Sequence, residues 1–238
     1  MNAVDCTLPT PEENLALDEA LLLTAEERPG TGEVLRFWEL PTQAVVLGSG
    51  GIVADDVQIA ACEAAGIPIR RRSSGGGTVL LGPGCLCYSL VLAYERHPAL
   101  GEIGRSYRWI LDKVIEGLGV PGLAVQGICD LTWGDRKCSG NAQQRKRYHL
   151  LHHGTLLYRF DLSCVTSFLT LPPRRPDYRA DRPHEDFVCN LPLSRAELIA
   201  RVTAAWDVVL TQRFVLPLER VADLVATKYA RVEWNRRR

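Results

Sequence analysis

Apolar residues are distributed differently near the ends of this chain and in its middle. Close to the N-terminus, residues 10–27 (TPEENLALDEALLLTAEE) combine an apolar segment with a capping-box pattern at Thr10 and Glu13. We therefore predict a helix here, with a proline in its first turn. The helix should end before the Pro29-Gly30 pair, because neither residue favours helix continuation.

Shorter apolar runs with β-branched and aromatic residues fill the middle of the chain. Residues 34–40 (VLRFWEL), 44–48 (AVVLG) and 85–93 (CLCYSLVLA) predict strands. Two more such runs, 67–72 (IPIRRR) and 78–82 (TVLLG), flank a glycine-rich run. We therefore expect the glycines to form a loop that joins two strands.

Other segments have helical patterns. They are residues 55–66, residues 103–119, residues 194–214 with a second capping box at Ser194 and Glu197, and a last helix from Pro217 toward Trp234. Strands and helices do not alternate regularly, which argues against a doubly wound fold. We predict a mixed α/β (α+β) fold in which helices cover a mixed β-sheet, formed by a single domain over residues 1–238.

The composition is that of an ordinary globular protein and excludes several classes. The 238 residues are 46% hydrophobic and 24% charged, and 28 Lys and Arg balance 28 Asp and Glu. A general nucleic-acid binder carries a basic excess, so any cationic site must be local. The sequence predicts neither a secretory signal nor a membrane span. The eight cysteines include no C-x-x-C pair, so we expect reduced thiols in a cytoplasmic protein without a zinc site.

Residues 70–79 (RRRSSGGGTV) place the densest cationic cluster of the chain beside three successive glycines. Bare glycine amides can approach an anion closely, and arginine guanidiniums suit phosphate or carboxylate. The run lacks the Lys-Ser/Thr ending of a P-loop. Residues 45–56 (VVLGSGGIVADD) lack the third glycine of a dinucleotide fingerprint. The glycine-rich run therefore predicts an anion site of another kind.

A second polar stretch, residues 129–157, begins with a predicted hairpin. The Trp-Gly-Asp-Arg segment at 133–136 favours a two-residue loop, in which case Asp130 faces Ser139 across the strands. Because side chains alternate between faces, one face should be polar and the other apolar. The polar face would carry Asp130, Thr132, Lys137 and Ser139. The apolar face would carry Cys129, Leu131 and Cys138.

Together these stretches resemble the lipoate–protein ligase family of the biotin/lipoate ligase superfamily. The matching pieces are NLALDEALL, RRRSSGGGTV, CDLTWGDRKCSGNAQQR, HHGTLL and YARVEWN, between Asn14 and Asn235. The resemblance implies a catalytic domain with the fold of biotin ligases and class II aminoacyl-tRNA synthetases. It also implies that ATP activates lipoate or octanoate as an acyl-adenylate, and that a lysine of a lipoyl carrier domain receives the acyl group. Many members carry an accessory C-terminal domain that this sequence would stop short of, so a separate small accessory protein is a further expected partner.

The resemblance also implies roles for individual residues. Lys137 matches the family's lysine that contacts the acyl group and the phosphate, and we expect it to stabilise developing charge without forming a covalent bond. The residues expected to bind ATP or the acyl-adenylate are Arg71, Arg72, Ser73, Ser74, Gly75, Gly76, Gly77, Thr78, Val79, Leu80, Asp130, Lys137, Ser139 and Gly140. Mg²⁺ should accompany ATP and need few protein ligands, so no dedicated metal site is predicted. Asp130 is a candidate partner of the metal or of Lys137, and His153 is interpreted as structural.

Two alternatives stay open at this point. An octanoyl or lipoyl transferase of the same superfamily would hold the acyl group as a cysteine thioester, which needs a thiolate near the cationic lysine. The predicted strand alternation points Cys138 and Cys129 away from Lys137. Cys85 and Cys87 share one face of a neighbouring strand and can face the pocket, although core packing is the favoured interpretation. The second alternative is a non-catalytic subunit that binds lipoyl carriers, but such a subunit has no use for a cationic lysine.

Overall fold

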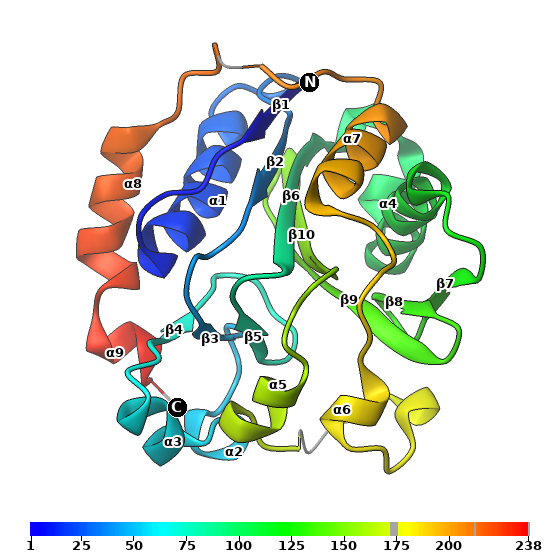
Figure 1. Ribbon diagram of the computed structural model, residues 1–238. Coiled ribbons are helices and arrows are strands. Elements are labelled where there is room, and N and C mark those ends of the chain that lie inside the picture. The colour runs from blue at the N-terminus through cyan, green and yellow to red at the C-terminus, as the bar shows by residue number, and fades with distance from the viewer. Residues whose placement is uncertain (172–175, 212, 238) are drawn as a thin grey trace.

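The computed structural model describes residues 1–171, 176–211 and 213–237, and a mixed seven-stranded sheet lies at its centre (Figure 1). The strands lie in the order β1 (Asn2–Asp5), β2 (Val34–Trp38), β6 (Cys85–Ala93), β10 (His149–Leu157), β9 (Arg136–Arg145), β8 (Asp130–Trp133) and β7 (Leu123–Gln126). β1 pairs with β2 in parallel, and the other neighbouring strands pair antiparallel. The predicted mixed sheet is confirmed.

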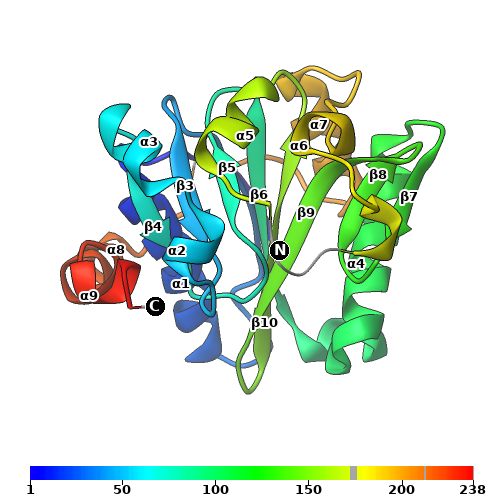
Figure 2. The same ribbon diagram turned by 90° about the horizontal axis from the view of Figure 1, so that it is seen from below.

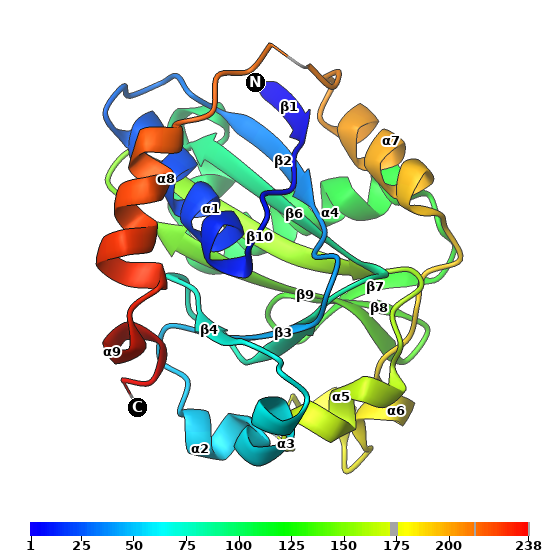
Figure 3. The ribbon, with the colours of Figure 1, turned by 60° about the vertical axis from the view of Figure 1, so that its left-hand side comes forward.

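A second, three-stranded sheet carries the glycine-rich loop. Its strands lie in the order β4 (Ile69–Arg71), β3 (Ala44–Leu47) and β5 (Val79–Leu81). The glycine-rich loop is the connection between β4 and β5, as the sequence predicts. Figure 3 shows this sheet beside the large one, between α1 and the short helices α2 and α3.

Helices cover both faces of the large sheet. α1 and α8 lie on one side of it, and α4 and α7 lie on the other (Figure 2). The α-helices are α1 (Pro11–Glu26), α2 (Val53–Asp56), α3 (Ile59–Ala64), α4 (Ile103–Leu118), α5 (Ser163–Phe168), α6 (His184–Phe187), α7 (Arg195–Ala205), α8 (Leu218–Leu224) and α9 (Val232–Asn235). Short 3₁₀ turns occupy Tyr94–Arg96, Pro98–Gly101 and Asp177–Arg179, and a π-helical turn occupies Val225–Tyr229. Both predicted capping boxes form, at the starts of α1 and α7.

Strand β6 shows why its sequence is almost continuously apolar. Its side chains alternate between two hydrophobic cores, so both faces of the strand are buried. Cys87 and Val91 enter the core under α1, while Leu86 and Leu90 enter the core under α4 and α7. One consequence matters for the site: the α1 side of β6 carries Cys85, Cys87 and Ser89.

Three predicted helices are wrong in their extent. The segment 55–66 divides into α2 and α3 because Val57 forms an isolated bridge with Leu169, and Gln58 N donates to the Phe168 carbonyl. The segment 194–214 is helical only as far as Ala205, since the chain then turns through a positive φ at Asp207. The last predicted helix is broken into α8, the π-helical turn and α9.

Candidate active site

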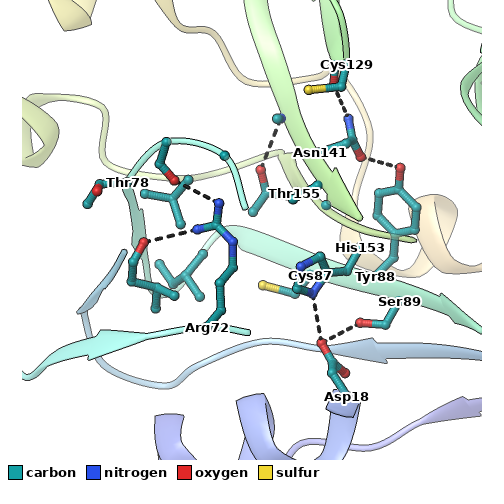
Figure 4. Close-up of a pocket in the computed structure, with 18 of the residues that line it drawn as sticks. Asp18, Arg72, Thr78, Cys87, Tyr88, Ser89, Cys129, Asn141, His153 and Thr155 are labelled. Atoms are coloured by element: carbon teal, nitrogen blue, oxygen red, sulfur yellow. Dashed lines mark hydrogen bonds and ion pairs between the residues drawn. The ribbon is translucent and has the colours of Figure 1, made fainter. Parts of the chain in front are cut away.

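Two adjoining cavities open where the glycine-rich loop, strands β6 and β10, and the β8–β9 hairpin meet. We call the smaller one, with a volume of ≈ 150 Å³, the inner cavity, and the larger one, with a volume of ≈ 750 Å³, the outer cavity. Figure 4 shows the inner cavity. Both cavities are lined by Gly77, Thr78, Val79, Cys129, Asp130, Lys137, Gly140 and Thr155. These shared residues form the boundary between the two spaces.

The inner cavity has an apolar wall and a group of polar side chains on its α1 side. The apolar side chains are those of Leu15, Trp38, Val46, Val79 and Leu81. The polar side chains on the α1 side are those of Asp18, Ser89 and His153, which come from α1, β6 and β10. Ser89 Oγ donates to Asp18 Oδ2 at 2.7 Å, and Asp18 Oδ1 pairs with Arg36 Nη1 at 2.6 Å. These polar groups are therefore partnered, and the apolar wall suits an aliphatic chain.

Ser74, His153 and Asp18 follow one another in the order of a hydrolase triad. Ser74 Oγ lies 2.6 Å from His153 Nε2, and His153 Nδ1 lies 3.4 Å from Asp18 Oδ2. Ser74 is only 1% exposed, however, and its hydroxyl oxygen accepts a hydrogen bond from Arg72 Nε. A nucleophile must reach its substrate, so this network ties α1 and β10 to the glycine-rich loop instead. His153 is thus part of a structural network, as predicted, but it also lines the inner cavity.

Arg72 shapes the glycine-rich loop from inside. Its guanidinium donates to the carbonyls of Val46, Gly75 and Gly77, as well as to Ser74 Oγ. Gly76 takes a φ of 88° within this curve, which a residue with a side chain rarely adopts. Arg72 lines the inner cavity, but these contacts already use guanidinium donors that were expected to bind phosphate.

Arg71 was predicted to bind the anion, but it lies outside both cavities. It is fully buried, and its guanidinium donates to the carbonyls of Gly48, Gly51, Trp234 and Asn235. The side chain therefore fastens the C-terminal helix α9 to the loop after β3, and it does not line either cavity. Ser73, Ser74 and Gly75 are likewise absent from the lining of both cavities. The other predicted residues of the run, Arg72, Gly76, Gly77, Thr78, Val79 and Leu80, line at least one cavity.

Lys137 and Asp130 form an ion pair at the boundary between the cavities. Lys137 Nζ lies 2.7 Å from Asp130 Oδ1, and the side chains are 28% and 14% exposed. The predicted pairing of Asp130 with Ser139 is wrong by one position, because a β-bulge between Leu131 and Thr132 places Asp130 opposite Gly140. Ser139 and Gly140 still line the outer cavity, whereas Thr132 is fully buried outside both.

The position of Cys129 also differs from the prediction, because Cys129 lies in the turn between β7 and β8 and not within a strand. This residue lines both cavities beside Lys137 and Asp130, and it does not lie on the apolar face of the hairpin. Asn141 Nδ2 donates to the Cys129 carbonyl at 2.8 Å, and Asn141 Oδ1 accepts from Tyr88 Oη at 2.5 Å. Burial, followed by the Asp130 charge, raises the pKa of the Cys129 thiol.

The other candidate cysteines separate into two groups. Cys138 is fully buried in the core under α4 and α7, so the prediction that it packs behind Lys137 is confirmed. Cys87 lines the inner cavity and Cys85 the outer one, although both also belong to the core under α1. Burial raises the pKa of Cys87 well above its usual value, and the neighbouring Cys85 thiol adds to this shift.

Several residues that line the cavities were not predicted from the sequence. Asp18 was detectable as one of two adjacent carboxylates within an apolar helical segment, and Asn141 lies within the polar stretch 129–157. Tyr178, which lines the outer cavity, lies in a segment without a local signal. Within residues 1–171, 176–211 and 213–237, no helix combines the length and apolar character needed to cross a bilayer. In these same ranges, no three His, Cys, Asp or Glu side chains gather as metal ligands.

Comparison with known proteins identifies the family. The family described as the lipoyl protein ligase A/B catalytic domain matches residues 10–205. The octanoyltransferase LipM of Carboxydothermus hydrogenoformans is 34% identical over 169 residues, which cover 63% of this chain and 62% of that protein. A probable lipoate-protein ligase A of Mycoplasma genitalium is 30% identical over 161 residues, or 68% of this chain and 47% of that protein. The aligned part is thus less than two thirds of each relative's length.

Solved structures give the same fold. A bi-partite lipoate protein ligase from Thermoplasma acidophilum, described with its E2 lipoyl domain, has a TM-score of 0.84 at 20% identity and covers 99% of this chain and 95% of its own. A lipoate-protein ligase A bound with ATP has a TM-score of 0.83 at 20% identity, with coverage of 99% and 98%. These likenesses confirm the mixed α/β fold expected from the resemblance. The chain belongs to the lipoyl protein ligase A/B catalytic-domain family.

Proposed function

We propose that this protein is a lipoate–protein ligase that activates lipoate or octanoate with ATP and transfers the acyl group to a lysine of a lipoyl carrier domain. The observation that carries this proposal is the position of Lys137. Its ammonium lies at the boundary between the small inner cavity, which has an apolar wall, and the wider outer cavity. A cation in this place can contact an acyl carboxylate on one side and a phosphate on the other.

In the proposed first step, the aliphatic chain occupies the inner cavity and its carboxylate points toward Lys137. A carboxylate oxygen attacks the α-phosphorus of ATP, a P–O bond forms, and the bond to the departing pyrophosphate breaks. The two reacting groups are both anions, so a fixed positive charge between them lowers the barrier. In the second step, the neutral amine of the carrier lysine attacks the acyl carbonyl. An amide forms, AMP leaves, and the amine proton passes to solvent.

The outer cavity supplies the groups for ATP in this proposal. Thr78, Val79, Leu80, Ser139 and Gly140 line it. Mg²⁺ would enter with the nucleotide and neutralise phosphate charge. This cavity offers Asp56 and Asp177 as carboxylates for it, since both oxygens of Asp130 already have a donor. One or two carboxylates plus phosphate oxygens are a usual Mg²⁺ environment, so the donor set fits an ATP-borne ion.

The proposed acceptor is a lipoyl carrier domain, because the related archaeal ligase is described with its E2 lipoyl domain. That ligase is also described as bi-partite. We therefore propose that a separate small protein assists this chain, which acts as one catalytic domain. Addition of such a protein should raise the rate of acyl activation, and full turnover by the purified chain alone would contradict this part of the proposal.

The ligase proposal predicts an exchange of pyrophosphate into ATP that depends on the acid. The purified protein, with Mg²⁺ and labelled pyrophosphate, should form labelled ATP when lipoate or octanoate is added, because acyl-adenylate formation is reversible. Butyrate should support the exchange poorly, since a short chain leaves the apolar wall of the inner cavity uncovered. Transfer of an acyl group from an acyl carrier protein without ATP, in the absence of any exchange, would contradict the ligase and favour the transferase.

A second candidate function has its own structural support. Cys129 lines both cavities beside Lys137, which is where an octanoyl or lipoyl transferase would need its nucleophile. The Cys129 thiolate would attack a thioester carbonyl, form a new thioester and release the donor thiol. The carrier amine would then form the amide and release Cys129. The likeness to the LipM octanoyltransferase is as strong as the likeness to named ligases.

Substitution of Cys129 by serine distinguishes the two routes. Under the ligase proposal, Cys129→Ser should keep acyl activation within about threefold of the wild type, because the thiol takes no covalent part. Under the transferase route, the same variant should lose transfer from an acyl thioester. Cys6→Ser is the matched control, since Cys6 is another half-buried thiol and does not line either cavity. Intact-protein mass spectrometry of the wild type would show a trapped octanoyl group only on the transferase route.

A further inference from the structure

The Asp130 carboxylate is shared between Lys137 and a residue from outside the hairpin. Lys137 Nζ lies 2.7 Å from Asp130 Oδ1, and Tyr178 Oη donates to Asp130 Oδ2, also at 2.7 Å. Tyr178 belongs to the 3₁₀ turn Asp177–Arg179 and lines the outer cavity. Each oxygen of the carboxylate therefore has one strong donor, and the lysine and the tyrosine compete for the same negative charge.

Tyr178 is held in a fixed place relative to the hairpin. Arg182 Nη2 donates to the Tyr178 carbonyl at 2.8 Å and to the Asp135 carbonyl at 3.0 Å, and Arg182 Nη1 donates to Asp135 Oδ2 at 2.9 Å. Asp135 lies in the turn of the same hairpin that carries the ion pair. The tyrosine ring also packs against Phe187 with ring centroids 5.3 Å apart. The contact of the Tyr178 carbonyl with Arg182 and the packing of its ring against Phe187 thus hold the hydroxyl toward Asp130.

The hydroxyl acts on Asp130 as a neutral donor. Burial, followed by the Asp130 charge, raises the pKa of Tyr178, so the phenol stays protonated at neutral pH. A donor to a carboxylate draws part of its negative charge toward itself and leaves less for the second partner. Without the hydroxyl, Asp130 would attract the Lys137 ammonium more strongly. An ammonium held more strongly by its own carboxylate is less able to stabilise a substrate anion.

We propose that Tyr178 is a positioning residue that acts through Asp130 and keeps the Lys137 ammonium available to the two cavities. The sharing of the Asp130 carboxylate between Lys137 and Tyr178 follows from the contacts alone. Its consequence for catalysis rests on the proposed function. The inference extends the site to the segment between α5 and α6, which contributes no other partner to this ion pair in the described part of the chain.

The test measures the ammonium directly, by competitive labelling of lysines with acetic anhydride across a pH series and mass spectrometry of the Lys137 peptide. Tyr178→Phe should raise the labelling midpoint of Lys137 by about half to one pH unit. This shift corresponds to about three- to tenfold lower labelling at a fixed pH below the midpoint. Asp130→Asn should lower the midpoint. If the tyrosine acts through the carboxylate, Tyr178→Phe should add no further shift in the Asp130→Asn background.

A matched control exists outside the cavities. Tyr158 Oη donates to both oxygens of the Glu39 carboxylate at 3.0 Å, so Tyr158→Phe removes the same type of hydrogen bond. This control should leave the Lys137 midpoint unchanged. The proposal is overturned if Tyr178→Phe does not shift the midpoint, or if it shifts the midpoint equally with and without the Asp130 carboxylate.

Activity gives a second readout that separates this inference from the proposed function. In acid-dependent pyrophosphate exchange, Tyr178→Phe should lower kcat about three- to tenfold and leave KM for the acid nearly unchanged, since the inner cavity is untouched. A change in KM alone would overturn the positioning role. If the wild type shows no exchange at all, the ligase proposal fails while the labelling experiment still decides the role of Tyr178.

Discussion

Replacement of Lys137 by alanine should lower the rate of acyl-adenylate formation by at least about 10²–10³, the usual cost of removing one preorganised donor from developing charge. The ammonium lies 2.7 Å from Asp130 at the boundary of the two cavities, and no second lysine lines either of them in the described ranges. Water that replaces the side chain would have to reorient as charge develops. Single-turnover measurement of acyl-AMP formation tests this expectation.

The fold should survive this change. Lys137 is 28% exposed, and an ion pair of this kind contributes about 1 kcal/mol or less to stability. Lys113→Ala is a control for lysine removal, because Lys113 lies on α4, outside both cavities. Its rate should stay close to that of the wild type. A Lys137→Ala enzyme with a normal circular dichroism spectrum and a rate within threefold of the wild type would remove Lys137 from the mechanism.

The sequence predicted most elements of the fold because local patterns determine them. The capping box at Thr10 and the continuous apolar run of β6 are local properties, and both elements appear where expected. The break between α2 and α3 could not be predicted in the same way. It depends on the bridge between Val57 and Leu169, which lie far apart in the chain. Local propensity cannot report a contact of this kind.

In the candidate site, too, features set by local sequence could be predicted, and features set by contacts between distant parts of the chain could not. The glycine-rich loop could be found because its residue types are unusual, and Lys137 because it lies on the polar face of the predicted hairpin and matches a lysine of the family that the sequence resembles. The role of Arg71 could not, since the Trp234 and Asn235 carbonyls that occupy its guanidinium come from the other end of the chain. The prediction for Cys129 was wrong because β8 begins only at Asp130, so Cys129 lies in the preceding turn, where strand alternation does not determine its side.

Asp18 provides the largest expected effect on stability. Its carboxylate is 2% exposed and pairs with Arg36, which is fully buried. Asp18→Ala would leave the guanidinium without its anionic partner, although it keeps hydrogen bonds to Asn14 and to the Cys6 carbonyl. Loss of one partner of a buried ion pair typically costs about 3–5 kcal/mol in the free energy of unfolding. Urea denaturation at neutral pH would measure this loss.

Two further variants show whether the unpaired charge is the cause. Removal of both charges in Asp18→Ala/Arg36→Met should recover part of the stability, because no buried charge is then left without a partner. Glu102→Ala serves as the control for an exposed pair. Glu102 and Arg105 are 67% and 60% exposed, so their loss should cost no more than about 0.5 kcal/mol. A double variant as unstable as Asp18→Ala would assign the loss to packing and not to charge.

The contribution of the Asp18 carboxylate to the free energy of unfolding should depend on pH. Burial by itself would raise the pKa of Asp18, but the Arg36 charge and the His153 hydrogen bond outweigh it and lower the pKa below its usual 3.8. A lowered pKa in the folded state means that the unfolded chain binds the proton more readily. The contribution of Asp18 is therefore complete at neutral pH and is lost as the pH falls through the folded-state value, below about pH 4. The difference in unfolding free energy between the wild type and Asp18→Ala should shrink over this acid range, and a constant difference down to pH 3 would show that the ionised carboxylate is not what stabilises the fold.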